Sequence, residues 1–169
     1  MPICLLAAAT HSDSILPPSS AFYNEYNNFG IYGGAKMGNI DGHGKVSHHN
    51  VFAFPNVYGK NCFWNWPGWF PKKGYQEQFY SNACIMQSAN QNYISMPGSC
   101  TFKNTSSIGI HVHDNKVFGP GAQASISGCK EKTVSVSDWI KLGIDPGTTI
   151  ADVPSNDEIM QMGMAALTG

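Results

Sequence analysis

Four ring-bearing side chains recur at one position in this chain, two residues before an asparagine. They are Tyr26, His48, Tyr80 and His113. Tyrosine and histidine both serve as general acids and bases. If the segments that carry them stack as neighbouring strands, the rings lie about 4.8 Å apart and can meet successive sugars of an extended polysaccharide. The predicted chemistry is removal of the proton next to a uronate carboxylate and return of a proton to the leaving oxygen.

That reaction also needs positive charge to neutralise the uronate carboxylate. Lys45, in the turn Asp41–Lys45, is the candidate, and Lys116 lies near the fourth ring. The chain contains no arginine, which weakens the catalytic interpretation. The competing interpretation of the four rings is an ordinary stacking ladder without chemistry.

Histidine spacing raises the question of a metal site. His111 and His113 are two residues apart on an expected strand, so they point to the same face. His48 belongs to another repeat, roughly 9 to 10 Å from His113 on strand spacing, which is too far for two ligands that each lie about 2.1 Å from one zinc ion. We therefore predict no metal centre and no cofactor, with a local set of His111, His113 and Asp114 as the open alternative.

A second candidate surface is the aromatic segment of residues 60–75. Its rings include Trp64, Trp66, Trp69 and Tyr75. Flat aromatic rings on a loop bind sugar faces through apolar contact and add hydrogen bonds from their polar edges. The alternative is structural, because a loop of this length needs aromatic side chains to pack it against the rest of the fold.

The asparagines that follow the rings define a repeat. They are Asn28, Asn50, Asn82 and Asn115, each followed by a short apolar run. The gaps between them are 22, 32 and 33 residues, a period typical of stacked repeats. Asparagine suits a repeated corner because it tolerates the left-handed backbone region and its amide can bond to the same residue in the next layer.

The segments between the asparagines have the composition of strands and turns. Short β-branched and aromatic runs, such as Val51-Phe52 and Val117-Phe118, alternate with glycine-rich turns. We divide the chain into an irregular lead-in at 1–22, repeats at 23–136 and a helical cap at 137–169. A last strand is expected at 133–136, before the cap. The cap is expected to hold a helix at 137–143 with Ser137 as N-cap, a turn at 144–148, and a helix to about Leu167 opened by the capping box of Ser155 and Glu158, and to pack over the open end of the stack.

This pattern resembles the right-handed parallel β-helix superfold of pectate lyases, with the asparagines as its internal ladder. It is also similar to uncharacterised β-helix repeat proteins of algae and other protists. That likeness rests on Tyr32-Gly33-Gly34, Gly42-His43-Gly44-Lys45, Asn50-Val51-Phe52, Cys62-Phe63 and Trp139 with Gly143, Asp145, Pro146, Gly147 and Thr148. The resemblance implies an all-β fold of about four coils with a short C-terminal helical cap. It does not imply one activity, because the superfold carries lyases, epimerases, adhesins and structural domains.

Composition narrows the partners. The 169-residue chain is 12% charged with a formal net charge of -1, so it lacks the basic patch that nucleic-acid binding needs. No apolar run reaches the roughly 20 residues of a membrane helix. The start of the chain, Met1–Ala9, is expected to be either a weak signal core or, preferably, a buried strand cut from a larger protein, and assembly with another chain through the N-terminal end is the further expectation.

Five cysteines favour an oxidising compartment. They are Cys4, Cys62, Cys84, Cys100 and Cys129, and up to two disulfides are expected among the last four. Asn104 begins a glycosylation sequon. The combined hypothesis is a secreted polysaccharide-binding or polysaccharide-modifying protein, lyase-like or epimerase-like if catalytic. The alternative is a non-catalytic component of an extracellular matrix, surface layer or filament, with buried free thiols in a cytosolic protein also left open.

Overall fold

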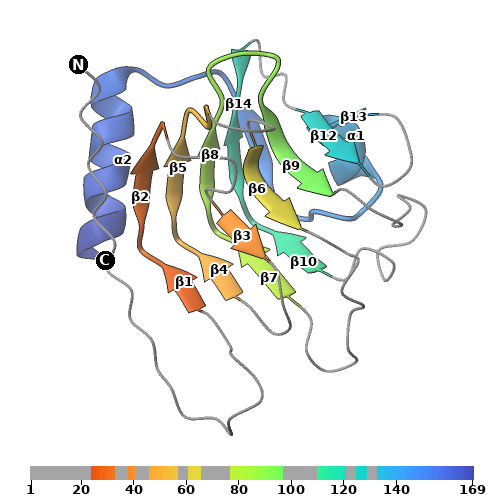
Figure 1. Cartoon of the computed structure of the whole chain (residues 1–169), viewed down its shortest axis with the longest axis horizontal. Coiled ribbons are helices and arrows are strands. Elements are labelled where there is room, and N and C mark those ends of the chain that lie inside the picture. The colour runs from red at the N-terminus through yellow and green to blue at the C-terminus, as the bar shows by residue number, and fades with distance from the viewer. Residues whose placement is uncertain are drawn as a thin grey trace, which may run out of the picture.

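The protein is built mostly from short strands in parallel sheets and ends in a helix (Figure 1). The computed structural model describes residues 24–32, 38–40, 46–56, 61–65, 77–96, 110–120, 125–128 and 133–169. Within these ranges no helix is long and apolar enough to cross a membrane. The expected lead-in at 1–22 lies outside the described residues.

The strands form three sheets. The first sheet has the order β1 (Asn24–Tyr26), β4 (Val46–His48), β7 (Glu77–Tyr80), β10 (Ile110–His113). The second sheet has the order β2 (Phe29–Ile31), β5 (Val51–Ala53), β8 (Ala83–Ile85), β11 (Lys116–Phe118), β14 (Thr149–Ala151). The third sheet has the order β3 (Gly38–Ile40), β6 (Asn61–Asn65), β9 (Asn92–Met96), β12 (Ser125–Gly128), β13 (Val134–Ser135).

The chain visits the three sheets in the same order four times, from β1 to β12. Each visit adds one strand to each sheet, and all pairs from β1 to β12 are parallel. The exception among the described strands is β13, which pairs antiparallel with β12. The expected last strand at 133–136 is therefore present as the two-residue β13, which runs opposite to β12.

All three sheets contribute to one hydrophobic core. Phe79 and Val112 come from the first sheet, Phe52 and Val117 from the second, and Phe63 from the third. In the second sheet, the middle residue of each central strand enters this core, as strand alternation requires. Side chains of strands β6 and β8 are also joined covalently, by the disulfide between the fully buried Cys62 and Cys84. Cys4, Cys100 and Cys129 lie outside the described residues.

The opposite face of the second sheet carries a second apolar cluster. Val51, Ala53 and Ile85 point to this face and pack with Ile159 of helix α2 (Asn156–Thr168). Figure 1 shows α2 running alongside β2, which it contacts together with β5. The helix was expected to close an open end of the stack. Instead it covers a sheet face, because apolar side chains at alternate strand positions would otherwise meet water.

The helix ends follow capping chemistry. The predicted capping box is confirmed: the Ser155 hydroxyl accepts from the Glu158 N–H, and the Glu158 carboxylate accepts from the Ser155 N–H. The N-cap of α1 (Val136–Lys141) is Ser135, not the predicted Ser137. Ser135 stands three residues before Asp138, whose N–H it caps and whose carboxylate accepts from its hydroxyl.

Candidate functional site

The four predicted rings form one continuous column across the first sheet. The register pairs Tyr26 with His48, His48 with Tyr80, and Tyr80 with His113. Their ring centroids lie 5.3, 5.1 and 4.9 Å apart, and the planes differ by 12°, 4° and 1°. The alignment made on the asparagines is thereby confirmed. We call these four residues the ring column.

Strand alternation places the ring column on the outward face of the first sheet. Ser47, Phe79 and Val112 each precede a column residue and are buried on the other face, whereas the column rings are only partly buried. Because the rings stack face to face, their faces are largely covered by one another. What they offer to a ligand is a row of polar edges, phenol hydroxyl and imidazole nitrogen in alternation.

Another outward row lies beside the ring column. Strand pairing aligns Val46, Gln78 and His111 along it, and each of these residues stands two positions before a residue of the ring column. His111 is exposed. A ligand lying along the column would therefore also meet an amide and an imidazole, both hydrogen-bonding groups that suit hydroxyl-rich molecules.

The histidine in the middle of the column is kept in its neutral form. His48 Nδ1 lies 2.7 Å from His49 Nδ1, so one ring donates and the other accepts. Partial burial lowers the pKa of His48, and the neighbouring His49 charge lowers it further. At neutral pH this imidazole is therefore available as a proton acceptor or hydrogen-bond partner.

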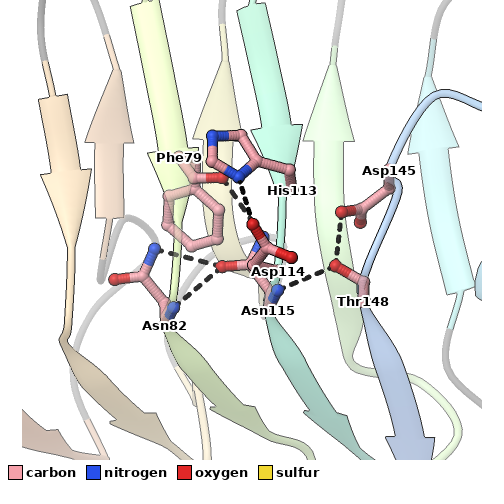
Figure 2. A network of polar contacts seen from close by, with 7 residues as sticks. All are labelled: Phe79, Asn82, His113, Asp114, Asn115, Asp145 and Thr148. Carbon is pink, nitrogen blue, oxygen red and sulfur yellow. Dashed lines mark hydrogen bonds and ion pairs between the residues drawn. The ribbon is translucent and has the colours of Figure 1, made fainter.

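The last histidine in the column is paired with a carboxylate (Figure 2). His113 Nδ1 lies 2.7 Å from Asp114 Oδ2. The side chains of His113 and Asp114 are 35% and 61% exposed, so the pair is open to ligands. A carboxylate on one ring nitrogen orients the imidazole and leaves the other nitrogen for proton transfer. The sequence suggested Asp114 only as a ligand in the alternative metal set with His111 and His113.

Behind the column, the four asparagines form the predicted ladder. The side-chain oxygen of Asn50 accepts from the N–H and the amide group of Asn28, at 3.0 and 2.9 Å. Asn82 accepts in the same way from Asn50, at 3.0 and 2.9 Å, and Asn115 from Asn82, at 2.9 and 3.2 Å. Since the inner three asparagines are about 1% exposed, these bonds satisfy buried groups that water cannot reach.

The left-handed backbone at each corner belongs to the residue before the asparagine. Asn27, His49, Ser81 and Asp114 have φ between 54° and 55°, whereas the ladder asparagines do not appear among the positive-φ residues. The prediction that the ladder asparagines adopt this conformation is wrong. Their side chains are needed for the ladder, and the sharp bend that ends each first-sheet strand is made one residue earlier.

Thr148 extends the ladder as a fifth member, or rung. The segment 144–148 was predicted only as a turn. The Asn115 N–H donates to Thr148 Oγ1 at 2.8 Å, and β14 continues the second sheet from β11. Gly147, with φ of 77°, occupies the bend before the rung. The signal was present in the spacing, because Thr148 follows Asn115 by 33 residues, the same interval that separates Asn82 from Asn115.

The fifth rung ends in a buried carboxyl group (Figure 2). The Thr148 hydroxyl donates to Asp145 Oδ1, while Asp145 Oδ2 has no hydrogen-bond partner among the described residues. Burial raises the pKa of Asp145 to about 6, against the opposing effect of the hydrogen bond from Thr148. The Tyr93 phenol lies near this carboxyl without good hydrogen-bond geometry, and burial followed by the negative charge of Asp145 raises the pKa of Tyr93.

A second pair of asparagines, not predicted from the sequence, also bonds between neighbouring strands. The Asn92 amide donates to Asn61 Oδ1 at 3.0 Å, and the two residues are in register at the start of β9 and β6. The cue was weak, since each asparagine simply precedes a different apolar run, and only the strand pairing shows that the two runs are neighbours.

Several predicted site residues lie outside the described part of the chain. These are Lys45, Trp66, Trp69, Tyr75 and the glycosylation residue Asn104. Trp64 lies in β6, where its backbone pairs with β3 and β9, and only its backbone is described. The aromatic surface proposed for residues 60–75 therefore stays a prediction.

No set of three or more histidine, cysteine or acidic side chains suited to a metal ion occurs in the described ranges. His48 and His113 lie on opposite sides of the Tyr80 ring, which agrees with the separation expected from two strand spacings. The ring column offers acid–base and hydrogen-bonding groups in a row.

Comparison with protein families, with curated proteins and with solved structures yields no match for this chain.

Proposed function

We propose that the protein binds an extended polysaccharide along the ring column. The observation that carries this proposal is the alternation of two phenols and two imidazoles at intervals near 5 Å on one outward sheet face. A regular row of donors and acceptors suits a polymer whose hydroxyl groups also repeat at regular intervals. Because ring faces are covered within the column, binding would rest on hydrogen bonds from ring edges.

The proposal includes a finer architecture and a cellular setting. The three sheets, visited in a fixed order, would be the faces of a right-handed parallel β-helix of about four coils. The Cys62–Cys84 disulfide supports an oxidising compartment, so we propose that the protein is secreted.

If the protein is catalytic, the reaction we propose is elimination on a uronate. The free nitrogen of His113 would take the proton next to the carboxylate, the C–O bond on the adjacent carbon would break, and a C=C bond would form. The leaving oxygen would take a proton from the Tyr80 hydroxyl. Such general acid and base groups contribute about 10² to 10⁴ in rate. Lys45 would supply positive charge for the substrate carboxylate.

A glycan array followed by affinity measurements tests the binding proposal. Tyr80→Phe keeps the stacked ring and removes its hydroxyl, so it should weaken binding of any ligand found by about tenfold, the equivalent of one hydrogen bond of about 1.4 kcal/mol. Tyr32→Phe is the matched control, because Tyr32 is exposed, forms no part of the column and makes a tilted ring contact with Phe54. Absence of binding to all uronates and neutral glycans would refute the proposal.

The competing proposal is a structural protein, and one observation favours it. The four rings cover one another's faces, as they would in a column whose only role is to stabilise the stack. On this interpretation, Tyr80→Phe would leave all partners unaffected, and a matrix or filament component would self-associate. Sedimentation of the wild-type protein across concentrations would detect that association.

A further inference from the structure

The pairing of His113 with Asp114 has a consequence for the form of the imidazole. We infer that Asp114 is a positioning residue that holds the neutral His113 ring in the Nδ1–H form, so that His113 Nε2 is a proton acceptor in the ring column. The inference rests on the proposed function for its biological meaning, since it names the base that a uronate ligand would meet.

The first step is the hydrogen bond. Asp114 Oδ2 can only accept, so the 2.7 Å contact with His113 Nδ1 requires the proton on that nitrogen. The same ring stacks on Tyr80 with planes 1° apart and centroids 4.9 Å apart. Contact on the ring face and on one ring nitrogen leaves little rotational freedom, which makes one tautomer the favoured one.

The Asp114 carboxylate is held in place through the Asp114 backbone and the residues beside it. Asp114 occupies the left-handed bend at the end of β10, with φ of 54°, and its N–H donates to the Pro146 carbonyl at 2.9 Å. Its side chain lies over Gly147, where an added Cβ would overlap Asp114 Oδ1. Only glycine leaves this space, so the bend before the fifth rung both supports the Asp114 backbone, through Pro146, and makes room for its carboxylate, at Gly147.

His113 and His48, the two histidines of the column, differ in the group that faces Nδ1. His48 Nδ1 faces another imidazole, that of His49, which can donate or accept, so its surroundings do not select a tautomer. A second carboxyl group, that of the buried Asp145, lies close enough to His113 for the His113 charge to lower the pKa of Asp145. Asp145 forms no hydrogen bond with the His113 ring, so it does not select the tautomer.

Long-range ¹H–¹⁵N correlation spectra of the labelled protein at pH 8 test the inference directly. The His113 signals, assigned by their loss in His113→Gln, should show a protonated Nδ1 and an unprotonated Nε2. Asp114→Gly removes the carboxylate and suits the positive φ, and it should shift the ring mainly to the Nε2–H form. Asp152→Asn, which removes an exposed carboxylate elsewhere, should leave the spectrum unchanged.

Two results would overturn the inference: an Nε2–H or evenly mixed tautomer of His113 in the wild type, or an unchanged tautomer in Asp114→Gly. Because no glycan enters the experiment, this failure is distinct from a failure of the proposed function, which the glycan array reports. The melting temperature of Asp114→Gly, measured in the same buffer, verifies that the variant is folded.

Discussion

Asn82 shows how much one side chain contributes at the residue scale. Its oxygen accepts two bonds from Asn50, and its amide donates to Asn115 Oδ1 and to the Ser47 carbonyl, the latter at 3.1 Å. All of these groups are buried, so a group that loses its partner through a substitution cannot form a hydrogen bond with water instead. The ladder therefore stabilises the fold mainly through the high cost of breaking it.

We expect Asn82→Ala to lower the free energy of unfolding by about 3 kcal/mol, because it leaves the buried Asn50 N–H without an acceptor and removes several further bonds. Urea unfolding followed by circular dichroism measures this. Asn156→Ala, at the exposed start of α2, is the control and should change stability by less than about 0.5 kcal/mol. Equal effects of the two substitutions would contradict the structural role of the ladder.

Asp145 makes stability depend on pH, also at the scale of one residue. Its carboxyl releases its proton near 3.8 in an ordinary setting and at about 6 in the folded protein. Between these values the folded state binds more protons than the unfolded state, so stability falls as pH rises from about 4 to about 6 and then levels off. The difference in pKa corresponds to about 3 kcal/mol.

Asp145→Asn should remove this contribution, because the amide can still accept from Thr148 but carries no charge at any pH. Unfolding free energies measured from pH 4 to pH 8 should show a smaller decline in the variant than in the wild type. Asp152→Asn serves as the charge-matched control and should keep the wild-type slope. Parallel curves for wild type and Asp145→Asn would show that the buried carboxyl does not control this pH dependence.

At the scale of the element, α2 acts as a cover for the second sheet. Gly163 is buried against the ring of Phe29, where an added Cβ would overlap the ring carbons. Glycine is normally a weak point in a helix, about 1 kcal/mol less favourable than alanine. Here it allows the helix to approach the sheet closely, so packing decides the residue rather than helix propensity.

Gly163→Ala should therefore destabilise the protein by about 1 to 3 kcal/mol, although the same change at an exposed helical position would stabilise it. Thermal unfolding measures the effect. Gln161→Ala, on the exposed side of α2, reports helix propensity alone and should be neutral or slightly stabilising. A higher melting temperature for Gly163→Ala would show that α2 does not pack as closely on Phe29 as the structure indicates.

At the scale of the whole molecule, one disulfide joins successive repeats inside the core. Cys62 and Cys84 are 22 positions apart in the sequence, so their bond restricts the unfolded chain. Loop-closure entropy gives about 3 kcal/mol for a loop of this size. The double variant Cys62→Ala/Cys84→Ala should lose about this amount relative to the oxidised wild type, with some further loss from the smaller side chains.

Urea unfolding with and without a reducing agent separates the two effects. The reductant should destabilise the wild type by more than it destabilises the double variant. Mass spectrometry after thiol alkylation checks that the bond forms in the purified protein. Insensitivity of the wild type to reductant, with both thiols alkylated before treatment, would show that this bond is absent.

Local sequence patterns predicted the ladder and the ring column because both depend only on the spacing of residues along the chain. Each ring residue stands two positions before an asparagine, and strand alternation then dictates its face, so the ring column could be read directly. The capping box of α2 was equally legible, since Ser155 and Glu158 act on each other within one helical turn. Short-range patterns like these need no knowledge of distant contacts.

The sequence by itself determined the repeat, the ladder and the ring column, because each depends on spacing along the chain. Only the tertiary structure decided which long-range partners those elements meet. It paired Asp114 with His113 above Gly147, buried Asp145 at the fifth rung, and laid α2 on a sheet face rather than over an end of the stack. These outcomes depend on apolar burial and on the satisfaction of buried polar groups between segments that are far apart in sequence.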